Sequence, residues 1–387
     1  MFYSKISRLI LLAKLSASVV RNIYSVLILS LIIIYFKLKK KKIIFFYHPK
    51  KILTLIHKYY IEDLLEDMSE NYSTIYGHEV NKNIGKKYFY IKQGYLKFIL
   101  NIDLFISNNV CDVFTKNSIR IYMHHDIYDT PLVSDKKEKE LFLRLIKYDY
   151  LFLPNRQSII MFQNFFKKNN SDFKNKIPRI METGYVKLDY LRKNIHLDKT
   201  IKNNSIIIAP TNPFAIEKLS IFNYLDELID ILLANVKFEI MFRPHPSNRK
   251  DQKILKIVRT FKNNKNFYFD ISENYSNTYS KSCCLITDLS GTAYTYAFFT
   301  KKPVIFCSKN EKLINELGYH KLAYFKDREK IGIIIQDLKQ IKNTMDNIKF
   351  IEKKIKNSND LLEKQMNYLG NSKIRIKQLI RKILIKK

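Results

Sequence analysis

The chain has 387 residues, more than one ordinary domain holds, and two domains fit it better because single domains commonly span about 100–200 residues. Hydrophobic residues make up 46% and charged residues 27% of the chain, so the composition excludes both a small disulfide-stapled scaffold and a mostly disordered chain. Lys and Arg total 68 against 36 Asp and Glu, and the formal charge of +32 favours an anionic partner such as nucleic acid, a phosphorylated substrate or an acidic lipid.

Glycine and cysteine usage argue against several common classes of protein. None of the eight glycines falls in a G-x-G-x-x-G or G-x-x-x-x-G-K-[ST] frame, so neither a dinucleotide-binding fingerprint nor a Walker-type ATPase is indicated. The four cysteines form no C-x-x-C pair and have no paired histidine spacing. We therefore expect no zinc site and no disulfide framework, and reduced thiols are typical of cytoplasmic proteins.

The N-terminal segment, residues 1–42, contains an uncharged apolar run over residues 23–36. Arg21 and Asn22 precede this run, and four lysines follow it at residues 39–42. Fourteen residues fall short of the roughly 20 that cross a bilayer. The segment is therefore predicted to associate with a membrane surface, with a spanning helix and a plain buried helix as alternatives.

From residue 43 onward, short apolar runs rich in strand-forming residues alternate with helical patterns. We expect strands at residues 43–47, 104–107, 119–123, 150–153, 205–209, 238–242, 267–269, 283–287 and 303–306, and helices at 137–148, 217–236 and 291–299. Continuous apolar strands that alternate with helices predict parallel sheets covered on both faces. The polar stretch 194–204 divides the pattern, so we predict an α/β domain over residues 43–200, a second over 201–345, and C-terminal helices over 346–387.

The last predicted helix is basic and amphipathic. Its apolar residues follow the i, i+3, i+4, i+7, i+8 spacing of one helix face: Ile376, Leu379, Ile380, Ile383 and Leu384. Lysine and arginine occupy its other faces. Two interpretations follow: a second membrane-binding helix, or a final helix docked on the body of the protein.

Polar clusters follow several of the predicted strands, and this is where ligands bind in parallel sheets. These clusters are His124-His125-Asp126, Glu182-Thr183-Gly184, Pro210-Thr211-Asn212, Arg243-Pro244-His245-Pro246 and Thr287 to Thr292. Because they lie in both halves, they predict one cleft between two facing domains. The other histidines lack such a context and are expected to be structural: His48, His57, His78, His196 and His320.

Each cluster has a functional and a structural interpretation. Arg243 and His245, held between prolines, suit anion binding, although the turn could be only a rigid loop. Ser290, Gly291 and Thr292 at a helix start could hold phosphate or merely cap the helix. His124 and His125 are adjacent where side chains alternate, so one of them should face the cleft. We find no D-x-D and no carboxylate pair to which a cation could be assigned.

Taken in order, these motifs resemble the CDP-glycerol glycerophosphotransferases of teichoic-acid and capsule synthesis. The resemblance rests on residues 123–132 (MHHDIYDTPL), 183–189 (TGYVKLD), 209–211 (APT), 243–246 (RPHP) and 287–306 (TDLSGTAYTYAFFTKKPVIF). Two positions depart from the family pattern. The glycine after the first histidine is replaced by His125 or Asp126, and the family's serine pair is Ser290-Gly291-Thr292 here.

The resemblance implies a GT-B fold of two facing Rossmann-like domains and a phosphotransferase reaction without a cofactor. A hydroxyl of a polymer or lipid-linked acceptor would attack the β-phosphorus of CDP-glycerol and expel CMP. His124, His125 and His245 are the implied catalytic residues, with His124 or His125 as the base. The implied donor-binding and phosphate-binding residues are Arg243, Asp288, Ser290, Gly291, Thr292, Thr211 and Gly184, and Asp288 is expected to orient rather than attack.

Other functions remain open at this stage. One is a glycosyltransferase of the same fold that uses a CMP- or UDP-linked sugar, and another is a nucleotide-sugar epimerase. A basic nucleic-acid-binding protein is suggested by the charge, but no RNP, zinc or helix-turn-helix signature is present, so we expect no nucleic-acid partner. The expected partners are a CDP- or CMP-linked donor, the acceptor and an anionic membrane surface, at the cytoplasmic face of the cell membrane.

Overall fold

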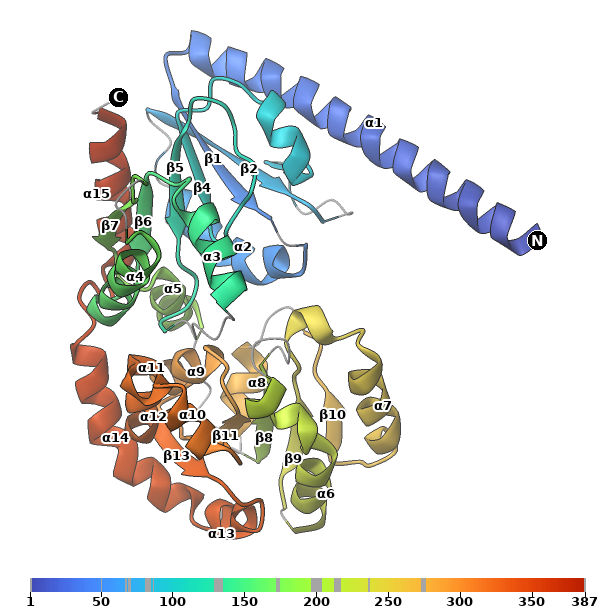
Figure 1. The fold of residues 1–387 in the computed structure, drawn as a ribbon, viewed down its shortest axis with the longest axis vertical. Helices are drawn as coiled ribbons and strands as arrows, with labels where there is room; N and C mark the ends of the chain where they lie inside the picture. Colours follow the sequence, from blue (N-terminus) through green and yellow to red (C-terminus); the bar gives the residue numbers. More distant parts are fainter. Residues whose placement is uncertain are drawn as a thin grey trace.

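The computed structural model describes residues 2–49, 51–66, 68, 71–80, 85, 87–128, 135–171, 175–195, 204–211, 217–235, 237–272 and 276–385. It forms two α/β domains, one above the other in Figure 1, and a long N-terminal helix. The predicted division at residue 200 lies outside the described residues.

The first domain is built on a parallel sheet that has seven strands within the described residues. They are β1 (Lys42–His48), β2 (Tyr72–His78), β3 (Tyr88–Tyr90), β4 (Leu104–Ser107), β5 (Ile119–Met123), β6 (Tyr150–Leu153) and β7 (Arg179–Glu182). Their order across the sheet is β3-β2-β1-β4-β5-β6-β7. The order reverses direction between β1 and β4, which makes this the switch point of a doubly wound fold.

Both faces of this sheet are buried, which explains the continuous apolar strands. Ile44 and Phe46 of β1 pack on one face, against α2 (Lys51–Glu66), α5 (Val186–Asn194) and α15 (Ser372–Ile385). Phe45 and Tyr47 pack on the other, against α1 (Phe2–Leu38), α3 (Asp135–Leu145) and α4 (Arg156–Asn169). A short 3₁₀ helix, η1 (Gln93–Phe98), adds Leu96 to the second face.

The second domain repeats this plan with a parallel sheet of six described strands. They are β8 (Ser205–Ile208), β9 (Glu239–Phe242), β10 (Phe267–Phe269), β11 (Ser282–Thr287), β12 (Val304–Cys307) and β13 (Gly332–Ile335). The order β10-β9-β8-β11-β12-β13 again reverses, here between β8 and β11. The prediction of two parallel-sheet α/β domains is thereby confirmed.

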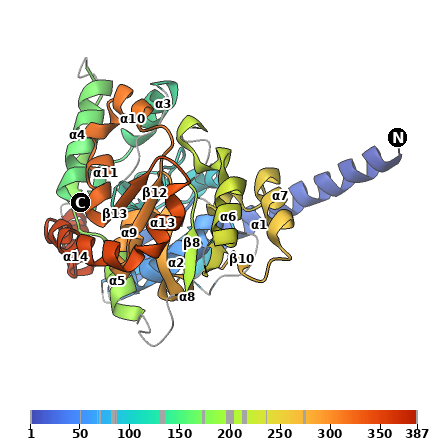
Figure 2. The ribbon, with the colours of Figure 1, turned by 90° about the horizontal axis from the view of Figure 1, so that it is seen from below.

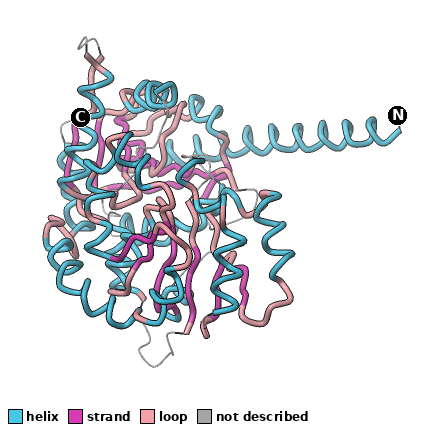
Figure 3. Tube along the Cα trace, turned by 60° about the horizontal axis from the view of Figure 1, so that its bottom comes forward, coloured by secondary structure: helices cyan, strands magenta, loops and turns pink. Residues whose placement is uncertain are grey.

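Helices cover both faces of the second sheet as well (Figure 3). One face is covered by α6 (Leu225–Asn235), α7 (Gln252–Phe261) and α13 (Gln340–Asp346). The other is covered mainly by α9 (Thr292–Thr300) and α14 (Ile348–Lys364). The remaining helices are α8 (Ser276–Lys281), α10 (Glu311–Glu316), α11 (Ala323–Lys326) and α12 (Arg328–Ile331), with the 3₁₀ turns η2 (Glu217–Leu219), η3 (Ile221–Asn223), η4 (Pro246–Asn248) and η5 (Tyr319–Lys321).

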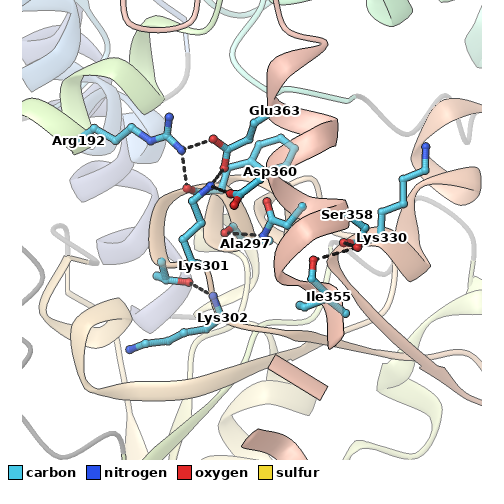
Figure 4. A network of polar contacts seen from close by, with 12 residues as sticks. Arg192, Ala297, Lys301, Lys302, Lys330, Ile355, Ser358, Asp360 and Glu363 are labelled. Carbon is cyan, nitrogen blue, oxygen red and sulfur yellow. Dashed lines mark hydrogen bonds and ion pairs between the residues drawn. The ribbon is translucent and has the colours of Figure 1, made fainter. Parts of the chain in front are cut away.

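The two domains share a hydrophobic core. Tyr128, Tyr185 and Leu188 of the first domain are buried in one cluster with Tyr294 and Phe298 of α9. A polar network, drawn in Figure 4, reinforces this joint. In it Arg192 of α5 donates to the Phe298 carbonyl at 2.8 Å and pairs with Glu363 of α14 at 2.6 Å. Lys301 binds the same Glu363 and also Asp360, so one carboxylate of α14 holds a residue from each domain.

The C-terminal helix α15 returns to the first domain. The five apolar residues predicted for one helix face are all buried in the core cluster that contains Ile44 and Phe46. Asp189 of α5 fixes the start of this helix, because its carboxylate accepts from the amides of Gly370 and Ser372 and from the Ser372 hydroxyl. The docked interpretation is therefore correct, and the expected membrane-binding role of this apolar face is wrong because the face is already covered.

The N-terminal helix α1 is longer than the predicted apolar segment, and its first part extends away from the body (Figure 2). Its apolar stretch, Ala17–Leu38, spans 22 residues and contains an 18-residue window with a mean hydropathy of 2.1, so it could cross a membrane by length and composition. The apolar segment predicted from sequence, residues 23–36, was too short because the apolar stretch continues past Arg21 and Asn22 toward the N-terminus. Arg21 lies over the Tyr90 ring at 4.4 Å, and Asn22 is buried and accepts from the Lys92 amide.

Candidate active site

The carboxyl ends of strands from both sheets meet at the joint between the domains. The predicted clusters follow β5 in the first sheet and β8, β9 and β11 in the second. β8 and β11 flank the switch point of the second sheet, where doubly wound folds bind nucleotides. The sequence-predicted residues therefore converge on one region, with the exceptions given below.

Asp288 joins the two loops at this switch point. Its carboxylate is buried and accepts from the backbone amides of Thr211 at 2.8 Å, Leu289 at 2.7 Å and Ile221 at 3.0 Å. Burial raises the pKa of this carboxyl, although the three backbone hydrogen bonds oppose the rise. Asp288 and the Thr211 amide thus bind each other and shape the loops.

Helix α9 starts directly after Asp288, at Ser290-Gly291-Thr292. Ser290 Oγ lies 3.4 Å from the Thr292 amide, and Thr292 Oγ1 lies 2.7 Å from the Tyr279 hydroxyl. All three residues are half-buried. Gly291 matters because a Cβ placed there would lie 3.1 Å from Cγ of Asp126 in the first domain. The two domains therefore lie close together at the start of α9, at a position that has no side chain.

The loop after β9 holds Arg243 and His245 in different ways. The Arg243 guanidinium pairs with Asp270 at 2.7 Å and donates to the Ser272 hydroxyl and carbonyl at 3.0 Å. His245 Nδ1 accepts from the Ser247 amide at 3.3 Å, so a neutral His245 ring would carry its proton on Nε2. Arg243 therefore braces the loop, and the Ser247 amide and hydroxyl orient the His245 ring through its Nδ1.

His124 and His125 differ sharply in environment. His124 is 5% exposed, and its Nδ1 lies 3.0 Å from the Tyr122 hydroxyl. Burial, assisted by the neighbouring His125, lowers the pKa of His124 to about 3. The His125 side chain is 23% exposed, and its Nε2 lies 3.6 Å from the Asp126 carboxylate. His125 is therefore the one of the pair that faces the joint.

Further basic groups surround Asp126. Burial acts to raise the pKa of this carboxyl, but four nearby side chains outweigh that effect and lower it: His125, Lys187, His124 and His245. His57 of α2 adds its ring, 5.5 Å from that of His125. We call these six residues the interdomain cluster: His57, His124, His125, Asp126, Lys187 and His245. They bring a candidate base, a carboxylate, a lysine and further imidazoles to the start of α9.

Two members of the interdomain cluster were missed as site candidates. Lys187 lies within the TGYVKLD motif and is buried, but spacing alone gave it no role. His57 was expected to be only structural, and burial lowers its pKa well below the usual range, with Lys187 as the next cause. Because His57 lies on a helix, no strand end marked it.

Gly184 lies in a different environment from the other predicted residues. It adopts a φ of +79°, and a Cβ there would lie 2.8 Å from both the Ser372 Cβ and the Tyr368 carbonyl oxygen. The structure thus packs Gly184 against the C-terminal segment rather than against the start of α9. Thr130, Pro131, Leu132 and Asn212 of the predicted motifs lie outside the described residues.

Among the described residues, no group of three or more His, Cys, Asp or Glu side chains is placed to hold a metal ion. The groups that the site does offer are imidazoles, a lysine, hydroxyls and the amides of a helix start. Such groups bind and neutralise phosphate oxygens, and a histidine beside a carboxylate can accept a proton. The arrangement is suited to transfer of a phosphorylated group.

Comparison with known proteins agrees with this chemistry. Residues 29–382 match the family described as CDP-glycerol:poly(glycerophosphate) glycerophosphotransferase. No curated protein matches the chain at a significant level.

Solved structures share the fold at low sequence identity. A variant of the wall teichoic acid polymerase TagF, soaked with CDPG, is 20% identical over 97% of this chain and 98% of its own, with a TM-score of 0.59. A co-structure of S. aureus MnaA with UDP is 12% identical over 89% and 97%, with a TM-score of 0.55. The UDP-GlcNAc 2-epimerase from Methanocaldococcus jannaschii is 14% identical over 88% and 99%, with a TM-score of 0.51.

The structural likenesses show a shared GT-B-like architecture, and the family match distinguishes between the activities found on it. The family match, over residues 29–382, includes all five sequence motifs that resemble the family, and these motifs lie in both domains. The chain belongs to the CDP-glycerol:poly(glycerophosphate) glycerophosphotransferase family and is a transferase that acts on CDP-glycerol.

Proposed function

We propose that the protein transfers glycerol phosphate from CDP-glycerol to a hydroxyl of a polymer or lipid-linked acceptor of teichoic-acid or capsule type, at the cytoplasmic face of a membrane. One observation carries the proposal for the site. His125, half-exposed beside Asp126, lies at the same joint as the Ser290-Gly291-Thr292 helix start and His245. A base of the first domain and phosphate ligands of the second thus share one site.

His125 is the proposed base. It accepts the proton of the acceptor hydroxyl while the hydroxyl oxygen bonds to the β-phosphorus of CDP-glycerol. The bond from this phosphorus to the bridging oxygen breaks, and CMP leaves with that oxygen. The nearby Asp126 carboxylate stabilises the imidazolium that forms, as carboxylates do beside catalytic histidines. His124 takes a supporting role because it is buried against Tyr122.

The second domain is proposed to bind the diphosphate. Negative charge on the transferred group is best stabilised by donors already in place before the reaction. The proposed groups are the His245 ring, the hydroxyls of Ser290 and Thr292 and the positive end of the α9 dipole, and Gly291 lets the backbone approach closely. Arg243 contributes through the loop that it braces, since its guanidinium is paired with Asp270.

The reaction is tested by nucleotide release from a panel of donors: CDP-glycerol, CDP-ribitol, CMP-sugars and UDP-sugars. We expect CMP release from CDP-glycerol that depends on an added hydroxyl acceptor. A His245→Ala variant, with an unchanged melting temperature, is the control for contaminating hydrolases. Release of nucleotide from a sugar donor and not from CDP-glycerol would overturn the proposal.

Membrane association is proposed from the exposed face of α1. This face carries apolar side chains at helical spacing, each at least half exposed: Val20, Tyr24, Leu27, Leu31, Ile34, Tyr35 and Leu38. The opposite face packs on the first sheet, where Leu29 is fully buried and Ile33 is 2% exposed. A helix bound to the protein on one side and apolar on the other fits a membrane surface better than a spanning position. Lys39 and Lys40 are exposed at its end, where anionic lipid attracts them.

Liposome flotation tests this orientation. Leu27→Gln with Leu31→Gln should reduce binding to vesicles that contain phosphatidylglycerol, whereas Leu361→Gln on α14, equally exposed, should not. High salt should weaken the residual binding by screening the lysines. Deletion of residues 1–40 is a poor test because it would remove Leu29 and Ile33 from the core. Wild-type protein that ignores anionic vesicles at low salt would contradict the proposal.

A further inference from the structure

Asp126 lies at a position that would also suit a phosphate group. A Cβ built on Gly291 would be 3.1 Å from both Cγ and Oδ2 of Asp126, so the carboxylate contacts the start of α9 from the first domain. The first turn of the nine-residue helix α9 carries the positive end of the helix dipole, although the Thr292 and Ala293 amides already face the Ser290 hydroxyl and carbonyl oxygens. A carboxylate is stabilised there for the same reason as a phosphate.

The charges around Asp126 strengthen this likeness to a bound anion. His125 Nε2 is 3.6 Å from Oδ2, and both Lys187 and His245 favour the ionised carboxylate. Lys187 is 8% exposed, so much of its positive charge acts within the protein rather than on solvent. The carboxylate is thus surrounded by basic side chains from both domains.

Two anions cannot share this position. The Asp126 carboxylate already fills the space beside Gly291, because a Cβ there would be only 3.1 Å from it. The proposed function places a donor phosphate at the same helix start. Like charges at such a separation repel strongly in a partly buried site, so the phosphate and the carboxylate exclude each other. Donor binding must therefore move Asp126.

We propose that Asp126 is a positioning residue that holds the anion site at the start of α9 until a phosphate group of the donor displaces it, after which the carboxylate orients His125 for proton transfer. This inference rests on the proposed function. The displaced carboxylate already lies beside His125, so a change of side-chain rotamer is enough to bring the two into a hydrogen bond. Binding of the donor and alignment of the base are then one coupled event.

The coupling predicts opposite effects on binding and turnover when the charge is removed. Asp126→Asn keeps the shape of the side chain but no longer competes as an anion, so we expect the Kd for CDP-glycerol, measured by calorimetry without acceptor, to fall about tenfold. We expect kcat to fall about 100-fold, because His125 loses its carboxylate. Asp126→Glu retains the charge and should bind donor no more tightly than the wild type.

A distant carboxylate provides the control for overall charge. Asp346 is exposed at the end of α13, so Asp346→Asn removes the same charge and should change neither Kd nor kcat. A Kd for Asp126→Asn that equals or exceeds the wild-type value would overturn the inference. If Asp126→Asn fails to fold, the Kd for Asp126→Glu decides, since binding tighter than that of the wild type would also overturn it.

The same measurements separate this inference from the proposed function. Wild-type protein that does not bind CDP-glycerol, or binds it without releasing CMP when acceptor is present, contradicts the proposed function. Wild-type protein that binds and turns over CDP-glycerol, with an Asp126→Asn variant that binds no more tightly, contradicts only the displacement of Asp126.

Discussion

The hydroxyl of Tyr185, in the first domain, lies 3.1 Å from the hydroxyl of Thr295 on α9 in the second. The same phenol oxygen donates to the backbone carbonyl of His125 at 3.0 Å. Both contacts are sheltered, because Tyr185 is 2% exposed and Thr295 is fully buried. The Tyr185 side chain therefore fixes the position of the His125 backbone relative to α9. His125 is the candidate base, and the start of α9 is proposed to bind the donor.

Tyr185→Phe should loosen this relationship. Removal of the phenol oxygen takes away one hydrogen bond from the His125 carbonyl and one from the Thr295 hydroxyl, and such a loss in a buried site costs about 1–3 kcal/mol. We expect a lower free energy of unfolding in urea and a roughly tenfold lower kcat. Tyr268→Phe, on the exposed side of β10, serves as the matched control and should change neither value.

His125 and His124 should respond differently to substitution. His125→Gln removes the proposed base, so kcat should fall at least about 100-fold while donor binding and melting temperature stay near the wild-type values. His124→Gln instead disturbs a buried ring that contacts Tyr122 and Phe162, so its main effect should be a lower melting temperature. Full activity in His125→Gln, with a well-folded but inactive His124→Gln, would reverse the assignment.

His245→Ala should lower turnover by about 100-fold or more, because the site loses a donor that stabilises developing charge. The melting temperature should change little, since the residue is half-buried in a short loop. Ser247→Ala tests the orientation of the ring separately. The Ser247 hydroxyl lies 2.6 Å from His245 Nδ1, so its loss should give a smaller fall in kcat than the loss of the ring. A His245→Ala protein with normal turnover would remove His245 from the site.

Ser290→Ala and Thr292→Ala should act mainly on donor binding. Each removes one hydroxyl at the helix start without changing the base, so calorimetry should show a Kd for CDP-glycerol raised roughly fivefold to tenfold. Thr260→Ala on α7 is a suitable control because its hydroxyl binds only the Lys256 carbonyl within its own exposed helix turn. Normal donor binding by both variants, with lost transfer, would indicate a catalytic role instead.

Acid should destabilise the protein through its buried histidines. Burial, reinforced by His78, lowers the pKa of His48 to about 3, and that of His124 is also about 3, against an ordinary value of 6.5. Between pH 6.5 and 3 the unfolded chain therefore binds more protons than the folded chain, so stability falls as the pH is lowered through this window. Melting temperatures measured from pH 7 to 5 should decrease.

A His48 variant identifies the source of this pH dependence. The His48 ring is buried beside Phe46, and neither nitrogen has a hydrogen-bond partner among the residues that the structure describes. His48→Phe should fold and should decrease less in melting temperature on acidification, since it removes one of the groups that gain a proton on unfolding. An unchanged slope would exclude His48 as a contributor.

Most strands inside the two sheets were predictable from sequence, whereas three of the four described edge strands, β3, β7 and β13, were not. The nine predicted strands are present, with ends that differ by a residue or so. The missed strands include β7 and β13 at sheet edges, and β2, whose YSTIYGH sequence has no continuous apolar run. β7 reads RIME and has no fully buried residue, so its burial pattern does not resemble that of an internal strand.

The site residues that directly follow a strand were predictable from sequence. The contacts that form only when the two domains dock were not. His125, His245 and Ser290 follow apolar strands, so their convergence could be expected from topology. The contact of Asp126 with Gly291 depends on how the domains dock, and local sequence carries no such information. Asp189 shows the same limit. Its TGYVKLD motif was recognised in the sequence, but its hydrogen-bond partners, the amides of Gly370 and Ser372, are about 180 residues away and could not be predicted.

The return of α15 to the first domain has a consequence for synthesis of the chain. The core face that contains Ile44 and Phe46 is completed by Ile380 and Leu384, which are synthesised only after the whole second domain. A nascent chain that ends near residue 200 would expose this apolar face, so the first domain should depend on chaperones until α15 has been synthesised. Expression of that domain alone should therefore require residues 372–385 to be fused or supplied in trans as a peptide.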